Sequence, residues 1–407
     1  MTEPAHHRSR GLRLLILLGA LTAVGPLSLD LYLPAFPALA RDFGVAASRV
    51  QLSLTACLIG LAAGQLIAGP LSDRWGRRRP VIAGTVAYSA VTLLCAVAPS
   101  AELLTVARLV QGLAGGVGVV VARAVVRDLY SGVAAAKYFS RLVLVFGLAP
   151  IVAPSVGSLV LQFASWRGVF VVLAAIGALI AAAAAVGLPE TLPAERRTAG
   201  GIGEILRSGR RLVGDRVFVG YALTQGLAFA GLFAYIAGSS FVVQEVYGGT
   251  RTQFGLLFGL NAVGLVVLGQ VNSVLLDRFA PRRLLVATLA AGLLAGLALT
   301  GAATGHSLVL FASAMFVYVT SIGLVMPNGT ALALDRHPGM AGTASAVLGA
   351  IQSTIGSVAA PVVGREHHAL PMATVIVSCA TLALGAILLV ARPASPSRVD
   401  QGEMHMV

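Results

Sequence analysis

Charged side chains are scarce in this sequence: Asp, Glu, Lys and Arg together make up 11% of the 407 residues. Soluble globular proteins carry about 25% charged residues, and a chain with so few cannot cover a water-facing surface of its own size. Hydrophobic residues make up 57% of the chain, and the mean hydropathy is +0.88. This composition excludes a soluble or disordered protein and predicts an integral membrane protein.

Cysteine and lysine are also scarce, which excludes several kinds of site. Cys57, Cys95 and Cys379 lie far apart inside apolar stretches and offer neither a disulfide framework nor a zinc-binding spacing. The only lysine, Lys137, follows no glycine-rich loop, which excludes a phosphate-binding loop for ATP. The sequence also lacks His-Glu-x-x-His and Gly-x-Ser-x-Gly patterns. We therefore expect no enzyme, no metal site and no ATP-driven pump.

Hydrophobic residues gather in twelve stretches long enough to cross a membrane as helices, which need about 20 residues each. The stretches are too long and continuous for barrel strands, which alternate over about 10 residues. The sequence therefore predicts an all-α integral membrane protein with twelve transmembrane helices, at 12–38, 49–72, 80–98, 102–128, 137–162, 167–188, 217–244, 252–276, 284–304, 307–334, 340–363 and 371–391.

The basic residues predict the orientation of these helices. Of the 29 Lys and Arg residues, 22 fall in the segments on the same side as the amino terminus, and five fall in the opposite loops. Basic residues are enriched in cytoplasmic loops, so we expect both termini in the cytoplasm. The net charge of +13 then reflects orientation in the membrane and no nucleic-acid partner is expected.

The longest polar segment divides the expected helices into two sets of six. A shift of 204 residues superposes the sets and carries Asp73-Arg74 onto Asp277-Arg278 and Arg78-Arg79 onto Arg282-Arg283. Two such repeats around a mid-membrane site are typical of carriers that work by alternating access. We expect two pseudo-symmetric six-helix bundles, with an N-terminal bundle at 1–188, a cytoplasmic linker at 189–216, a C-terminal bundle at 217–391 and a cytoplasmic tail at 392–407.

Several motifs resemble those of the major facilitator superfamily. Its loop signature between helices 2 and 3 resembles Gly69-Pro-Leu-Ser-Asp73-Arg74-Trp-Gly76-Arg77-Arg78, and its fourth-helix motif resembles Arg108-Leu-Val-Gln111-Gly112. The first-helix signature of its drug:proton antiporters is similar to Leu29-Asp30-Leu-Tyr32-Leu-Pro34-Ala-Phe-Pro37. Three further segments resemble motifs of the bicyclomycin/chloramphenicol-resistance (Bcr/CflA-type) branch: Arg123-Ala-Val-Val-Arg127-Asp128-Leu-Tyr130, Leu188-Pro-Glu-Thr-Leu192 and Met326-Pro-Asn328-Gly-Thr-Ala-Leu. The resemblance implies the superfamily's fold and proton-driven drug efflux.

One motif departs from the resembled family. The fifth-helix antiporter motif reads G-x-x-x-G-P-x-x-G-G, whereas this chain has Ala149-Pro150-Ile-Val-Ala153-Pro154-Ser-Val-Gly157-Ser158. Small residues still allow close packing, so we regard the motif as weakened rather than lost. Pro150, Pro154 and Gly157 would seal the pathway against ion leak, although helix packing alone also explains them.

Asp30 is the one acid that lies clearly within an expected span. A carboxylate at this depth costs about 2.5–3.5 kcal/mol on insertion scales, so we expect it to face a cavity and to bind a proton or a cationic drug. The alternative is an Asp that caps the helix break before Pro34. Arg108 is the expected partner, because the two residues lie roughly 12 and 9 Å from the same surface at 1.5 Å per residue. A purely structural ion pair is the alternative.

The remaining charged candidates lie toward the expected cytoplasmic side. Arg123 either faces the cavity and assists proton exit or extends to the lipid headgroups. The resemblance implies that Asp73, Arg77 and Asp128 form a charge network that holds the cytoplasmic side shut, while a tight turn with orienting arginines is the alternative. The full gating set is Gly69, Asp73, Arg74, Gly76, Arg77, Arg78 and Asp128.

Uncharged polar residues within the spans are the candidates for a substrate cavity. Such groups also often bond neighbouring helices to one another, so each has a structural alternative. The candidates are Tyr32, Gln111, Gln225, Tyr235, Asn261, Asn328 and Gln352.

The sequence thus predicts a proton antiporter that exports small, mostly apolar drugs across a bacterial inner (plasma) membrane by alternating access. The alternative is a dedicated sugar or amino-acid carrier that works by symport or facilitated diffusion. No cofactor is expected, because the proton gradient supplies the energy. The expected partners are a small-molecule drug, protons and the lipid bilayer. We expect a monomer, since twelve helices enclose a complete pathway.

Overall fold

The computed structural model describes residues 5–130, 132–197, 210–305, 307–335, 341–363 and 368–391. These residues form helices joined by short connections and contain no strand, which confirms the predicted all-α fold. Part of the expected linker and the whole expected tail lie outside them. The helices are α1 (Ala5–Asp30), α2 (Phe36–Phe43), α3 (Ala47–Trp75), α4 (Arg78–Ala96), α5 (Ala101–Leu129), α6 (Gly132–Phe163), α7 (Trp166–Gly187), α9 (Arg216–Phe241), α10 (Arg251–Leu276), α11 (Pro281–Ala303), α12 (Leu308–Asp335), α13 (Ala341–Val363) and α14 (Leu370–Gly385).

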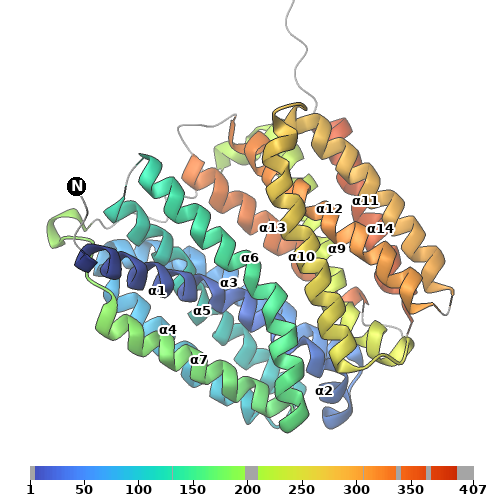
Figure 1. Cartoon of the computed structure of the whole chain (residues 1–407), viewed down its shortest axis with the longest axis horizontal. Coiled ribbons are helices and arrows are strands. Elements are labelled where there is room, and N and C mark those ends of the chain that lie inside the picture. Colours follow the sequence, from blue (N-terminus) through green and yellow to red (C-terminus); the bar gives the residue numbers. More distant parts are fainter. Residues whose placement is uncertain are drawn as a thin grey trace, which may run out of the picture.

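The helices form two groups in order along the chain (Figure 1). Helices α1–α7 make the first half and helices α9–α14 make the second half. The halves meet where α6 packs against α10 and where α13 packs against α3. Ten segments of the described residues are long and apolar enough to cross a membrane, and α6 and α13 add the shorter apolar stretches Leu148–Phe163 and Val347–Ala359.

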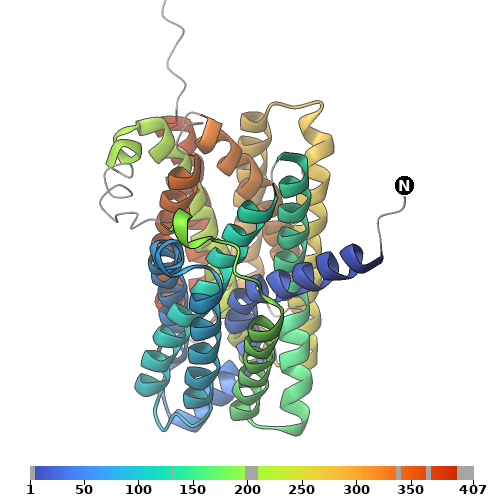
Figure 2. The ribbon, with the colours of Figure 1, turned by 90° about the vertical axis from the view of Figure 1, so that its left-hand side faces the viewer.

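The connections between the helices lie at two opposite ends of the bundle (Figure 2). The turn between α2 and α3 contains Gly44, which has a φ of 64°. The turn between α3 and α4 contains Gly76, which has a φ of 86°. We name the two ends of the bundle the Gly44 end and the Gly76 end.

The first expected span is not one continuous helix. Leu31 N–H makes the last α-helical bond, to Leu27 at 3.1 Å, and a short 3-10 segment, η1 (Leu33–Ala35), precedes α2. Pro34 and Pro37 have no backbone N–H, so neither can donate to the residue four positions earlier. The expected helix 12–38 is therefore wrong in two respects, because it breaks after Asp30 and continues to Phe43.

Glycines bring α3 and α5 into close contact in the first half. A Cβ atom at Gly60 would overlap the Leu109 carbonyl oxygen and lie 2.9 Å from the Leu113 nitrogen. A Cβ at Gly112 would likewise overlap the Cys57 carbonyl oxygen. Small residues at such crossings let two membrane helices approach backbone to backbone. This contact fixes α5, and with it Arg108, against the rest of the first half.

We expect Gly60→Ala to destabilise the protein by about 2–3 kcal/mol, because the added methyl group forces the two backbones apart. The control is Gly69→Ala on the same helix, where no heavy atom lies within 4 Å of the added Cβ. This control should be neutral or slightly stabilising. Thermal unfolding in detergent measures both, and equal melting temperatures would contradict the close-contact argument.

Candidate functional site

Asp30 is the last residue of α1 and lies directly before the break. Its side chain is buried, with 4% exposed, and it makes no hydrogen bond or ion pair with any residue that the structure describes. The segment just after it is tightly held, because a Cβ at Gly157 of α6 would overlap the Leu31 carbonyl oxygen. A carboxyl group within the first span thus lies beside a tightly held segment, with no hydrogen-bond or ion-pair partner among the described residues.

Arg108 of α5 is fully buried and binds the same break. Its Nη2 donates to the Ser28 carbonyl oxygen at 2.6 Å, its Nη1 donates to Gln111 Oε1, and its guanidinium lies 4.3 Å from the centre of the Tyr32 ring. The last α-helical bond of α1 is the one to the Leu27 carbonyl. The Ser28 carbonyl lies beyond it and can therefore accept a hydrogen bond from the guanidinium. A cation of this kind loses its hydration, and the carbonyl and the aromatic face replace part of it.

The expected ion pair between Asp30 and Arg108 is not formed in this conformation. No described ion pair contains either residue. The depth estimate behind that expectation placed the helix end at residue 38, whereas α2 extends to Phe43. The guanidinium nevertheless reaches Ser28, two residues before Asp30, so the two charges belong to one region of the first half.

A chain of polar side chains extends from Arg108 through the first half. Gln111 donates to Thr92 Oγ1 at 2.7 Å, and the Tyr88 and Ser28 hydroxyl oxygens lie 2.7 Å apart. We name Ser28, Tyr32, Tyr88, Thr92, Arg108 and Gln111 the Arg108 network. Sequence analysis missed Ser28, Tyr88 and Thr92. The only available signal was the i, i+4 spacing of Tyr88 and Thr92 in an otherwise apolar stretch.

The second half presents polar and aromatic groups opposite Asp30. Asn261 of α10 donates to the Tyr235 hydroxyl at 2.9 Å, and the Tyr235 ring stacks on Phe258 at 5.2 Å between centres. Asp30 lies near enough to Tyr235 for its negative charge to act on the phenol. The structure therefore brings together one candidate from the first half and two from the second.

The other cavity candidates bond to residues of their own half. Gln225 donates to Met326 O and to Thr330 at 2.9 Å, and Asn328 donates to Asn272 at 2.7 Å. Gln352 approaches the sulfur of Met326 at 3.4 Å. In the first half, Tyr32 and Gln111 are fully buried within the Arg108 network. These contacts join helices, and none of the five residues makes a described bond to Asp30.

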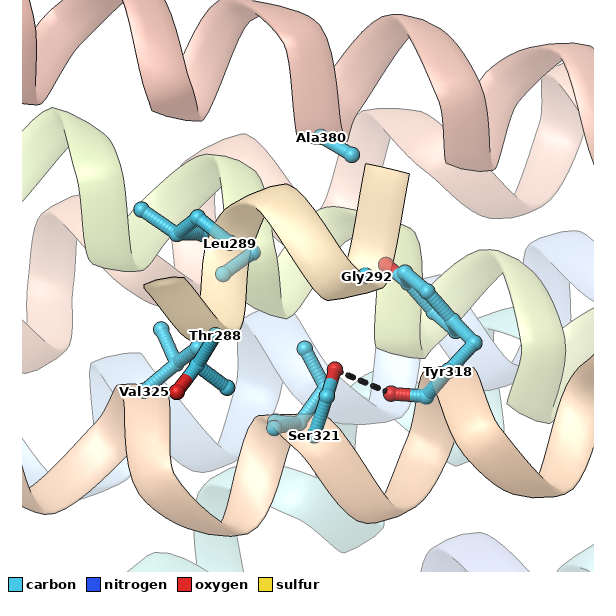
Figure 3. Close-up of a pocket in the computed structure, with 9 residues that line it drawn as sticks. Thr288, Leu289, Gly292, Tyr318, Ser321, Val325 and Ala380 are labelled. Atoms are coloured by element: carbon cyan, nitrogen blue, oxygen red, sulfur yellow. Dashed lines mark hydrogen bonds between the residues drawn. The ribbon is translucent and has the colours of Figure 1, made fainter. Parts of the chain in front are cut away.

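A small cavity lies inside the second half among α9, α11, α12 and α14 (Figure 3). Thr288, Gly292, Tyr318 and Ser321 are among its lining residues, and the Ser321 hydroxyl donates to the Tyr318 carbonyl oxygen at 2.6 Å. Its volume of about 10 Å³ corresponds to a single water molecule. This cavity is too small for a drug.

The loop at the Gly76 end forms a charge network around Arg77. The Arg77 guanidinium pairs with Asp73 and with Asp128, the latter at 2.9 Å, and donates to Ser72 at 3.0 Å. Partial burial alone would lower the pKa of Arg77, but the bonds to the two carboxylates outweigh it and raise that pKa. The structure thus brings Asp73, Arg77 and Asp128 together.

Glu190 completes this network from the segment after α7. Its carboxylate accepts from the backbone N–H groups of Arg77 at 2.8 Å and Arg78 at 3.3 Å, where α4 begins. Burial alone would raise the pKa of Glu190. The hydrogen bonds from these N–H groups and from that of Leu192 lower it by more, so the net shift is downward. A Cβ at Gly76 would lie 2.7 Å from the Glu190 carboxyl carbon, so the left-handed Gly76 also makes room for the acid. Sequence analysis assigned no role to Glu190.

The second half lacks this network because Pro281 occupies the position that corresponds to Arg77. Arg282 instead donates to the carbonyl oxygens of Ala391 at 2.6 Å and Ile387 at 3.0 Å. Its counterpart Arg78 donates to Ala185 O at the end of α7, also at 2.6 Å. Both arginines therefore satisfy free carbonyls at the carboxyl end of the sixth helix of their half.

Comparison with known proteins agrees with this architecture. Residues 18–361 match the family described as the Major Facilitator Superfamily. This chain belongs to the major facilitator superfamily. Similar members include the "Uncharacterized MFS-type transporter YdgK" of Bacillus subtilis, 39% identical over 90% of this chain and 92% of that protein. The "Bicyclomycin resistance protein homolog" of Haemophilus influenzae is 32% identical over 91% of this chain and 94% of that protein.

Other comparisons extend the family assignment. "Multidrug resistance protein D" of Escherichia coli is 31% identical over 86% of this chain and 88% of that protein. Among solved structures, a bacterial homolog of the human lysosomal transporter Spinster superposes with a TM-score of 0.76 at 16% identity, covering 97% of this chain and all of that chain. A D-xylose-proton symporter superposes with a TM-score of 0.74 at 17% identity, covering 93% of this chain and 98% of that chain. At these identities the structures show the superfamily fold alone.

The two halves of this superfamily member are bonded to each other on the Gly44 side. Gln51 donates to Ala237 O at 3.0 Å, and Ser158 of α6 donates to Arg251 O at 3.0 Å. Within the described ranges, no hydrogen bond joins the halves at the Gly76 end. Helix α10 meets α6 through Gly255, where a Cβ would lie 3.4 Å from Pro154 O. The structure is therefore closed at the Gly44 end.

Four candidates lie outside these contacts. Arg123 of α5 is exposed and makes no hydrogen bond or ion pair with any described residue. Arg74 is exposed, and a Cβ at Gly69 would have open space around it. Pro150 lies inside α6 and is half-buried. Their roles in this superfamily member stay predictions.

The Tyr32 ring should contribute to stability through its contact with the buried Arg108. We expect Tyr32→Leu to cost about 2 kcal/mol beyond the cost of Tyr32→Phe, since only the leucine variant removes the aromatic face from the desolvated guanidinium. Tyr32→Phe keeps the ring and loses the contact with Ser53 at 3.0 Å. Chemical unfolding in detergent measures both variants, and equal losses would show that the ring contact contributes nothing.

The Glu190 carboxylate should stabilise the Gly76 end above its ordinary pKa of 4.5. Because folding lowers this pKa, the contribution is present at neutral pH and is lost as the pH falls below about 4.5. At pH 7, Glu190→Gln should lower the free energy of unfolding by about 1–2 kcal/mol. The difference from wild type should shrink at pH 4, whereas the exposed Glu195→Gln should differ little from wild type at either pH. A difference that is independent of pH would refute the carboxylate's role.

Proposed function

We propose that this chain is a Bcr/CflA-type antiporter that exports small, mostly apolar drugs from a bacterial cell in exchange for protons. The observation that supports it best is the buried carboxyl group of Asp30, which has no hydrogen bond or ion pair among the described residues and lies close before η1, which packs against α9 and α10 of the second half. The names of the similar proteins from Haemophilus influenzae and Escherichia coli point to the same activity. The proton gradient supplies the energy, and the twelve helices act as a monomer in the inner membrane.

The proposed orientation follows from the basic residues. The segments at the Gly76 end carry most of the Lys and Arg residues, so that end faces the cytoplasm, together with both termini. The hydrogen bonds between the halves then close the outer side, and the conformation is inward-facing. In the opposite conformation, the Arg77 network and Glu190 hold the cytoplasmic side shut.

The proposed coupling depends on the charge of Asp30. Removal from water favours the neutral carboxyl group, so Asp30 keeps a proton while it is enclosed. Contact with cytoplasmic water or with a cationic drug favours release of that proton. Arg108 supplies a fixed positive charge nearby, and Arg123 assists the proton on its way to the cytoplasm. The aromatic pair Tyr235–Phe258 and the amide of Asn261 offer a drug an apolar face with one polar group.

Everted membrane vesicles with an acidic interior test this proposal. Addition of chloramphenicol or a cationic dye should release protons from wild-type vesicles, and Asp30→Asn should abolish the release. Asp42→Asn is a control on the same first span, because Asp42 bonds Trp166 and Arg167 at the Gly44 end and should be dispensable for coupling.

Three outcomes would overturn parts of the proposal. Proton release that survives in Asp30→Asn would place the proton site elsewhere. Equal loss in Asp42→Asn would point to a folding defect instead of coupling. Uptake of a defined sugar or amino acid, with no response to any drug, would favour the metabolite carrier.

A further inference from the structure

The broken first helix is bonded directly to the other half of the molecule. The Ser240 hydroxyl, near the end of α9, donates to the Leu33 carbonyl oxygen at 2.6 Å. Gln244 of the following π-helical segment η3 (Val242–Val246) donates to Pro34 O at 3.3 Å and to Ser240 Oγ at 2.8 Å. Helix α9 also packs against η1 and α2. We name these bonds the first-helix gate.

Proline makes the Leu33 carbonyl available to this gate. In a continuous helix the carbonyl of residue 33 would accept the N–H of residue 37, and Pro37 has none. Leu33 O accepts a 3-10 bond from Phe36 N–H instead, which leaves its second lone pair open to a donor from outside the helix. Ser240 is that donor, and both residues are fully buried, so water cannot take its place.

The other bonds between the halves are less suited to hold the Gly44 end closed. The Arg41–Glu245 pair spans 3.1 Å, but its side chains are 65% and 32% exposed, and exposed pairs contribute little. Gln51 donates to Ala237 O, which lies inside the continuous helix α9 and already belongs to a helical ladder. The bonds from Ser158 to Arg251 O and from Thr55 to Ser357 O join other segments. Among the bonds that the structure describes between the halves, only the first-helix gate acts on the break itself, three residues from Asp30.

We propose that the Ser240 hydroxyl, through its bond to the Leu33 carbonyl, is the positioning group that holds the outer side closed over Asp30. Rupture of this bond frees the break from the second half and admits water to the carboxyl group. The inference depends on the alternating-access part of the proposed function and is independent of the drug and of proton coupling.

Spin-label distance measurements on the full chain in nanodiscs test the gate. Labels at Ala46→Cys, in the turn before α3, and at Thr304→Cys, directly after α11, report the separation of the halves at the Gly44 end, since both positions are exposed and lie in different halves. Cys379→Ala removes the half-buried native thiol, whereas the other two cysteines are fully buried. Ser240→Ala should raise the ratio of open to closed molecules about fivefold, as expected for one lost hydrogen bond.

Ser239→Ala is the matched control. Ser239 is the preceding residue on the same helix and is also buried, but its hydroxyl has no partner among the described residues. This variant should leave the distance distribution unchanged. Equal distributions for Ser240→Ala and Ser239→Ala would overturn the proposal.

Pro37→Ala provides a second test that leaves Ser240 intact. The restored N–H competes with the Ser240 hydroxyl for Leu33 O, so this variant should also raise the open fraction. The double variant Pro37→Ala/Ser240→Ala should then be less open than the two separate effects predict, since both act on one carbonyl. Independent, fully additive effects would contradict the shared acceptor.

The same measurement separates this inference from the proposed function. Labels whose distance stays fixed in every variant, with and without substrate, would refute alternating access itself. Labels that move with substrate but do not respond to Ser240→Ala would refute the gate alone.

Discussion

The break in the first membrane helix is the constraint on which the other features of the site depend. The helical ladder of α1 ends at the bond from Leu31 to Leu27, and Pro37 has no N–H for Leu33, so the carbonyls of Ser28 and Leu33 accept side-chain donors from outside the helix. Arg108 of the same half binds the first, and Ser240 of the opposite half binds the second. Asp30 lies between these carbonyls along the chain. Its surroundings must therefore change when the halves separate, because only one of the two donors moves with it.

The buried guanidinium explains why Asp30 can remain unpaired. Arg108 replaces its lost hydration with a carbonyl oxygen, the Gln111 side chain and the Tyr32 ring, and its positive charge has no carboxylate partner among the described residues. An ion pair with Asp30 would hold the carboxyl group in its charged form and oppose proton binding. Arg108 instead binds the backbone near Asp30 and fixes the break without pairing with the acid. In the proposed coupling, positioning and proton exchange are thus divided between two residues.

The sequence predicted the class of fold and the individual candidates better than their contacts. Spans and charge bias follow from transfer energies that act residue by residue, and for that reason the helices were predictable. The end of the first span was not, since Pro37 lies in the first turn of a new helix, α2, where its missing N–H breaks no helical bond, and α2 continues to Phe43. The roles of Ser240 and Glu190 were also missed, because each bonds a backbone group that is distant in sequence and available only through local geometry. Such partners leave no pattern in one sequence.

The two ends of the molecule are held by different chemistry. At the Gly44 end, hydroxyl and amide groups of the second half donate hydrogen bonds to carbonyls of the first half. Neutral bonds of this kind are strong where water is excluded, so closure there depends on burial more than on charge. At the Gly76 end, the described ion pairs of Arg77 lie within the first half, and Pro281 occupies the corresponding position in the second. A carrier driven by protons benefits from this difference. Closure that depends on neutral hydrogen bonds does not compete electrostatically for the proton that, in the proposed coupling, Asp30 binds and releases.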